Sequence, residues 1–148
     1  MISALESHLG FWLRFVSNHV SESFRRRVEA LGVTVSEWVA LRTLHERGAL
    51  PPMALVETLG MTKGAVSKLV ARLESARLIT RESDPDDGRS QRIALSPGGK
   101  KLLPKLARAA DENDARFFGH LGARERKQLE TTLIELVRKH GLREVPVD

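Results

Sequence analysis

The chain has 148 residues, enough for about one domain with a real hydrophobic core. It lacks cysteine, which excludes disulfides, thiolate metal sites and thiol-based redox sensing, and we expect a reducing, cytoplasmic environment. Lysine and arginine number 24 against 19 acidic residues, a net charge of +5 that favours an anionic partner. Between residues 60 and 101, nine basic and five acidic residues concentrate +4 of that charge. No secretory signal or membrane span of ~20 apolar residues is present, so no membrane partner is expected.

Residues 2–31 are predicted to form one long helix, because apolar side chains recur there at steps of three and four residues. Three phenylalanines widen its apolar face, so this helix needs more than one neighbour to bury against. Thr34 and Glu37 have the spacing of a capping box, which predicts a second helix over about 35–47.

The rest of the chain is predicted to contain a helix pair, a hairpin and two further helices. In order, these are a short helix over about 53–59, a helix over about 62–75, strands over 78–82 and 91–95, a helix from Ser96 to Phe118 and a helix over about 123–140. The fold class is therefore mainly α with a small β-hairpin wing. A winged helix-turn-helix core is flanked by N- and C-terminal helices whose apolar surface exceeds what that small core can absorb.

The helix that begins at Thr62 and the hairpin tip predict a basic surface suited to DNA. In a helix-turn-helix the second helix enters the major groove, where hydroxyls and cations reach bases and phosphates. Gly64 would let this helix approach the DNA backbone closely. Arg89 at the hairpin tip suits a minor groove, and Asp87 is placed to hold its guanidinium by a hydrogen bond. The candidate DNA-binding residues are Thr62, Lys63, Gly64, Ser67, Lys68, Arg72, Asp87, Arg89 and Ser90.

Several motifs, in this order, resemble the MarR (multiple-antibiotic-resistance regulator) family of bacterial transcription factors. They are Leu31–Trp38 (LGVTVSEW), Met61–Val70 (MTKGAVSKLV), Asp84–Ser90 (DPDDGRS) and Leu95–Gly99 (LSPGG). The resemblance implies one domain over 1–148, with a winged helix-turn-helix DNA-binding lobe at 34–96 and dimerisation helices at 1–31 and 97–148. It also implies a homodimer on double-stranded DNA, with two recognition helices about one turn apart on a pseudo-palindromic operator. Most relatives repress transcription.

Many relatives release DNA when they bind a small phenolic or anionic effector between the dimerisation helices and the DNA-binding lobe. The candidate ligand-binding residues are Trp12, Phe15, His19, Trp38 and His45. Each has a plainer alternative: the aromatic residues serve the core or an interface, and the histidines are partly exposed polar residues.

No cofactor and no metal site are expected, against the alternative of a zinc site built from histidine with Asp111, Glu112 or Asp114. The sequence has no phosphate-binding glycine loop, nucleophile elbow or HExxH motif, so an enzyme is not expected. The alternative function is a winged-helix protein-interaction module without DNA binding, which the basic recognition helix disfavours.

Overall fold

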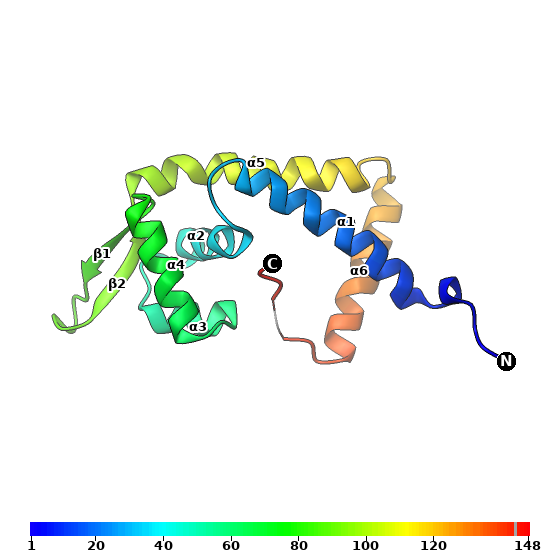
Figure 1. Cartoon of the computed structure of the whole chain (residues 1–148), viewed down its shortest axis with the longest axis horizontal. Helices are drawn as coiled ribbons and strands as arrows, with labels where there is room; N and C mark the ends of the chain where they lie inside the picture. Colours follow the sequence, from blue (N-terminus) through cyan, green and yellow to red (C-terminus); the bar gives the residue numbers. More distant parts are fainter. Residues whose placement is uncertain (144) are drawn as a thin grey trace.

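The computed structural model describes residues 1–143 and 145–148 and shows a mainly helical fold with one two-stranded hairpin (Figure 1). The elements are η1 (Leu5–Ser7), α1 (Leu9–Glu29), α2 (Val35–Arg47), α3 (Pro52–Leu59), α4 (Lys63–Ser75), β1 (Ile79–Ser83), β2 (Gln91–Leu95), α5 (Pro97–Phe118) and α6 (Ala123–Lys139). The predicted order of helices and hairpin is confirmed. The predicted start of the first helix at residue 2 is wrong, because His8 has an extended backbone and α1 begins only after it.

Caps fix where the helices between residues 34 and 75 begin and end. The Thr34 hydroxyl accepts from the Glu37 N–H at 3.2 Å, and the Glu37 carboxylate accepts from the Thr34 N–H at 2.9 Å, so the predicted capping box is present. Thr62 caps α4 by accepting from the Ala65 N–H at 3.1 Å. Gly60 ends α3 at a φ of 63°, a left-handed conformation that glycine adopts without strain.

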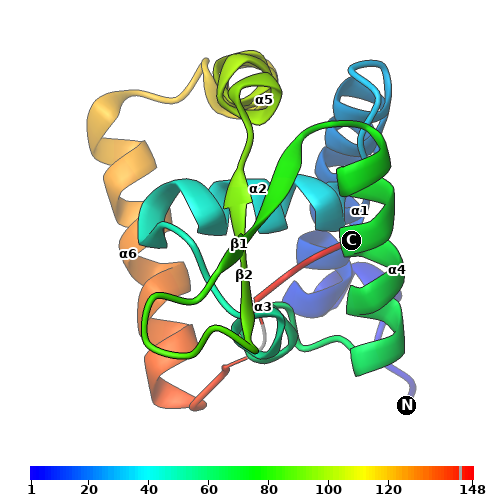
Figure 2. The same ribbon diagram turned by 90° about the vertical axis from the view of Figure 1, so that its left-hand side faces the viewer.

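The hairpin is anchored in the core at its base. β1 and β2 pair antiparallel, with Ile79 opposite Leu95. Leu50 extends the pairing by a single bridge, since its N–H donates to the Ile93 carbonyl at 2.9 Å and its carbonyl accepts from the Ile93 N–H at 2.7 Å. Ile79 and Ile93 are both buried. The tip of the hairpin therefore projects from a fixed base (Figures 1 and 2).

One hydrophobic core joins the lobe formed by residues 34–96 to α5. Leu41 of α2, Leu55 of α3, Leu73 of α4, Ile93 of β2 and Leu106 of α5 are fully buried in the same cluster. In Figure 1, α5 runs along one side of the molecule from the hairpin to α6, and α1 lies beside it. The same helix thus packs on the lobe at one end and carries α6 at the other.

η1, the first half of α1 and α6 lie at the end of the molecule opposite the hairpin (Figure 1). This end keeps large apolar side chains exposed. All of α6 is described by the structure, and none of its residues is buried within the chain. The large exposed apolar residues within η1, α1 and α6 are Leu5, Leu9, Trp12, Leu13, Phe15, Val16, Leu129, Leu133, Ile134, Leu136 and Val137. A contiguous apolar surface is typical of an interaction site. In residues 1–143 and 145–148, no helix has the length and apolarity to cross a membrane.

Candidate nucleic-acid interface

Helices α3 and α4 form the helix-turn-helix, and α4 presents a polar face to solvent. Its buried residues are Val66, Leu69, Val70 and Leu73. Thr62 at the N-cap is exposed, and so are Lys63, Ser67 and Lys68. The free N–H groups of the first turn add a partial positive charge to this face. The face thus combines hydroxyls, cations and a helix N-terminus.

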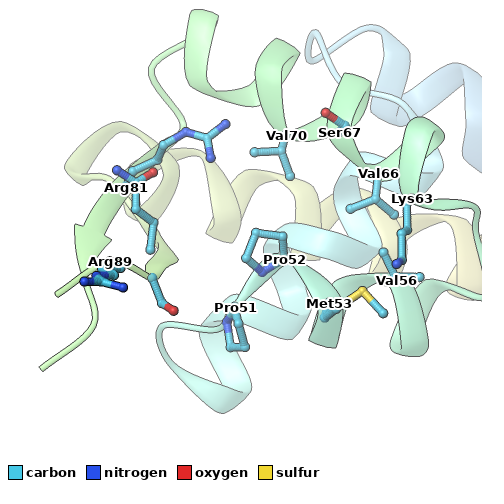
Figure 3. Close-up of a pocket in the computed structure, with 12 residues that line it drawn as sticks. Pro51, Pro52, Met53, Val56, Lys63, Val66, Ser67, Val70, Arg81 and Arg89 are labelled. Carbon is cyan, nitrogen blue, oxygen red and sulfur yellow. The ribbon is translucent and has the colours of Figure 1, made fainter. Parts of the chain in front are cut away.

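An open groove of about 570 Å³ lies between α3, α4 and the hairpin (Figure 3). It brings together four predicted residues, Lys63 and Ser67 of α4 with Arg89 and Ser90 of the hairpin. Arg81 adds a third cation on the hairpin side (Figure 3). No acidic residue stands among the described residues that line the groove. A groove of this charge, open to solvent, suits a phosphate backbone.

Two polar residues of the groove, Arg81 and Gln91, were not among those predicted. The Arg81 Nε donates to the Glu74 carboxylate at 2.9 Å, which ties β1 to α4. Gln91 directly follows Ser90, so extending the wing motif by one residue would have found it. The place of Arg81 in the groove follows only from the strand register, which puts Arg81 opposite Ile93.

Asp87 caps the hairpin turn. Its Oδ1 accepts from the backbone N–H of Arg89 at 3.0 Å, and its Oδ2 accepts from the Ser90 hydroxyl at 3.0 Å. The predicted hydrogen bond to the Arg89 guanidinium is not among the contacts of the described residues; the carboxylate accepts instead from a backbone N–H and a hydroxyl of the turn. The Arg89 side chain is exposed, at the tip that Asp87 shapes.

Asp84 holds the same turn at its base. Its Oδ1 accepts from the Asp86 N–H at 2.9 Å, and its Oδ2 accepts from the Arg92 Nε at 3.3 Å. The hydrogen bond from Asp86, assisted by the charge of Arg92, lowers the pKa of the Asp84 carboxyl below its ordinary value. Two of the acidic residues near the tip therefore serve the turn itself.

Arg72, one of the predicted DNA contacts, is also engaged within the protein, and its contact with DNA stays a prediction. Its Nε and Nη2 donate to the two carboxylate oxygens of Glu37, both at 2.8 Å, and Nη2 also donates to the Gly32 carbonyl at 2.9 Å. Glu37 is only 3% exposed, and its hydrogen bonds and then its negative charge raise the pKa of Arg72 above the ordinary value. A buried carboxylate requires such a partner, so this guanidinium ties α4 to the first turn of α2.

Gly64 lies exposed in the first turn of α4, and the protein has room for a side chain there. A β-carbon placed on Gly64 would meet no atom within 4 Å, and its φ is not left-handed. Glycine in a helix costs about 0.5–1 kcal/mol relative to alanine. The internal packing therefore gives no reason for glycine at this position, which fits the close approach of an outside molecule.

A second open cavity, of about 370 Å³, lies where α1, α2 and α5 meet. Its lining residues are Val20, Ser21, Phe24, Val35, Trp38, Val39, Ala110, Asn113, Asp114, Phe118, Pro146 and Asp148. Trp38 is the one predicted ligand residue in this described lining, where its ring meets Phe24 edge-on at a centroid distance of 6.4 Å. The cavity thus borders both α1 and the lobe formed by residues 34–96.

The other four predicted ligand residues lie elsewhere. Trp12, Phe15 and His19 form an exposed row along α1, and the rings of Phe15 and His19 stack with centroids 5.3 Å apart. His45 is exposed near the end of α2. The row on α1 belongs to the apolar end of the molecule and not to the cavity. In the described part of the chain, no three histidine or acidic side chains form a group that could hold a metal ion.

Known proteins are similar to this chain in sequence and in fold. A model of the MarR family matches residues 31–90. A probable transcriptional regulator from Pseudomonas aeruginosa is 33% identical, with 90% of this chain and 99% of that chain covered and a TM-score of 0.74. The transcriptional regulator HosA from Escherichia coli O111:H- is 29% identical over 107 residues, which cover 72% of this chain and 76% of HosA.

The fold is also that of a protein solved together with DNA. A mutant of MarR from E. coli, complexed with operator DNA, is 21% identical, with 87% of this chain and 93% of that chain covered and a TM-score of 0.73. The winged helix-turn-helix, its basic groove and these relatives agree on one assignment. The chain belongs to the MarR family of winged helix-turn-helix transcriptional regulators, which are DNA-binding proteins and not enzymes.

Proposed function

We propose that this regulator is a homodimeric repressor that binds a pseudo-palindromic operator and leaves it when a small molecule binds. The observation that carries the DNA-binding geometry is the groove between α4 and the hairpin, which gathers Lys63, Arg81 and Arg89 with no acidic residue in its described lining. One such groove on each protomer provides two basic sites for one duplex.

The two sides of the groove have different tasks on DNA. The exposed residues Thr62, Ser67 and Lys68 of α4 read base edges in the major groove, and Gly64 lets the helix approach the backbone. Arg89 enters the neighbouring minor groove, where negative potential is concentrated. Asp87 acts indirectly, because its carboxylate shapes the turn that carries Arg89.

The dimer forms through the apolar end of the molecule. The first half of α1 and the whole of α6 carry large exposed apolar side chains that find no cover within the described chain. A second copy would cover them and would set the distance between two recognition helices. This proposal assigns 1–31 and 97–148 to dimerisation and 34–96 to DNA binding.

The cavity between α1, α2 and α5 is the proposed effector site. Val20 and Phe24 line it from α1, which reaches the dimerisation end, while Val35 and Trp38 line it from α2 of the DNA-binding lobe. A ligand there contacts both parts, so it changes DNA affinity if it prefers one arrangement of them.

The DNA proposal is tested with duplex fragments selected from the source genome and labelled for fluorescence anisotropy. We expect specific dissociation constants of about 10⁻⁸ to 10⁻¹¹ M and a steep salt dependence. Arg89→Ala should weaken binding to most sequences and reduce the salt slope by about one, while Lys68→Ala and Ser67→Ala should also alter sequence preference. Arg108→Ala, which removes an exposed arginine of α5 outside the groove, is the matched control.

Two results would contradict this assignment. Equal effects of Arg89→Ala and Arg108→Ala would show that net charge, and not the groove, governs binding. Failure of the wild-type protein to bind any duplex at low salt would favour a winged-helix protein-interaction module. Size measurement by sedimentation tests the dimer separately, and a monomer at micromolar concentration would contradict it.

A further inference from the structure

The end of α4, the proposed recognition helix, lies against the start of α5 (Figure 1). The Arg77 N–H donates to the Glu74 carbonyl at 2.9 Å. The Leu78 N–H donates to the Leu73 carbonyl, also at 2.9 Å, which completes a Schellman turn at the end of α4. β1 begins directly after this turn, at Ile79. The recognition helix, the base of the hairpin and the first turn of α5 therefore meet at one place.

Arg77 has a backbone conformation that an arginine rarely adopts. Its φ is 60°, and in the part of the chain that the structure describes it is the only residue other than glycine with a left-handed φ. Glycine is the usual residue at this position of a Schellman turn, because a β-carbon is disfavoured there. Such strain persists only where the surrounding contacts fix the backbone. The contacts that fix this turn come from α5.

Ser96, the N-cap of α5, binds both carbonyls of the turn. Its hydroxyl donates to the Arg77 carbonyl at 2.6 Å, and its backbone N–H donates to the Leu78 carbonyl at 3.1 Å. The same hydroxyl oxygen accepts from the Gly99 N–H at 3.0 Å, which caps α5. Ser96 is 5% exposed, so these bonds are shielded from water. One side chain thus links the end of α4 to the start of α5.

Gly98 and Gly99 allow this close contact. A β-carbon on Gly98 would lie 2.8 Å from the Arg77 carbonyl oxygen, and one on Gly99 would overlap the Leu78 carbonyl oxygen. Glycine lowers the stability of a helix, so the close approach of the turn, and not helix propensity, explains the two glycines. The turn and α5 therefore touch backbone to backbone, which limits rotation of one relative to the other.

We propose that Ser96 is a positioning residue for operator recognition, because it fixes the angle between α4 and α5. From this junction α5 leads to α6 at the apolar end of the molecule, where the proposed dimer forms. The separation of two recognition helices in that dimer depends on the angle between α4 and α5 in each protomer. One base pair inserted between the half-sites moves them apart by about 3.4 Å and rotates one by about 35°. The inference rests on the proposed dimer, and it assigns the discrimination between such spacings to Ser96.

The role in spacing is tested with the operator fragment selected from the source genome. Fluorescence anisotropy compares this duplex with one that carries an inserted central base pair and with a duplex of one half-site. Wild-type protein should prefer the native spacing about 30-fold, a loss on insertion comparable to that of one mismatched base pair. Ser96→Ala should reduce this preference to about threefold. Its affinity for the single half-site should stay within about twofold of wild type, because the residues of α4 that face DNA are unchanged.

Three variants separate positioning from stability. Thr34→Ala removes the N-cap of α2, outside the junction, so it should lower stability but leave the spacing preference unchanged. Ser96→Thr keeps a hydroxyl and should restore the wild-type preference. If Ser96→Ala does not fold, Gly98→Ala replaces it, because its methyl group would push the Arg77 carbonyl away from α5. The same spacing preference in wild type, Ser96→Ala and Thr34→Ala would overturn the proposal.

A second measurement needs neither DNA nor a dimer. The chain has no cysteine, so Ala71→Cys on α4 and Arg108→Cys on α5, both at exposed positions, provide two unique sites for spin labels. Dilution with unlabelled protein restricts the measured distances to one protomer. Pulsed electron paramagnetic resonance should give a narrow distance distribution with Ser96 in place and a broader one in Ser96→Ala. An equally narrow distribution in both would overturn the proposal.

The two measurements together keep this proposal distinct from the proposed function. A broader distance distribution in Ser96→Ala, combined with a monomer in sedimentation, would contradict the proposed dimer and support the link between α4 and α5. A broader distribution in a dimer whose spacing preference is unchanged would overturn the role of Ser96 in operator recognition.

Discussion

Replacing Arg72 with alanine should destabilise the protein before it affects DNA contacts. The guanidinium makes two hydrogen bonds of 2.8 Å to Glu37, whose carboxylate is 3% exposed. Without Arg72, that carboxylate keeps the Thr34 N–H as its donor. Removing one partner of a buried pair costs about 3–5 kcal/mol. Because the Arg72 side chain is 53% exposed and water can reach its place, we expect a smaller loss of about 2–3 kcal/mol.

Urea denaturation of single and double variants measures this loss in the free energy of unfolding. Glu37→Gln removes the charge while an amide oxygen can still accept from Thr34, so Arg72→Ala should cost less in that background. The double-mutant cycle should give a coupling energy of roughly 1–2 kcal/mol between the two side chains. The melting temperature of Arg72→Ala should fall by roughly 5–10 °C.

Lys68→Ala is the matched control, since it removes a cation from the exposed face of the same helix. It should leave stability within about 0.5 kcal/mol of wild type and reduce the salt slope of DNA binding by about one. A structural role for Arg72 is refuted if Arg72→Ala is as stable as wild type but, like Lys68→Ala, has a lower DNA affinity and a reduced salt slope of DNA binding. Arg72 would then be a phosphate contact.

Three further results are expected. Gly64→Ala should raise stability by about 0.5–1 kcal/mol, because a methyl group fits there, yet weaken specific DNA binding roughly tenfold; unchanged anisotropy would contradict the close approach. Asp87→Ala should weaken DNA binding by loosening the turn but keep the wild-type salt slope, since no cation is lost; a reduced slope would argue against this role. The pKa of Asp84 is lowered on folding, so its stabilisation of the turn is present above its unfolded pKa and is lost as pH falls through the lower folded value. The amide NMR signal of Asp86 should shift in acid as that stabilisation is lost. In Asp84→Asn, this pH-dependent shift should be absent.

Short-range patterns were enough to predict the order of elements. The Thr34–Glu37 capping box, the Thr62 cap and the turn between the two strands each act within about four residues, and the structure contains all of them. The same holds for the basic face of α4, because helical periodicity separates its buried residues from Lys63, Ser67 and Lys68.

Those short-range patterns do not predict contacts between residues that are distant in the sequence. Arg72 looks like one more cation on a polar face, and only the packing of α4 against α2 brings it to Glu37, 35 residues away. Asn113 looks like a solvated helix residue, and only the packing of α5 against α1 buries it next to Val20, 93 residues away. A local pattern records whether a side chain is polar. Burial depends on which surfaces meet, and burial converts a solvated charge or amide into a tie between two helices.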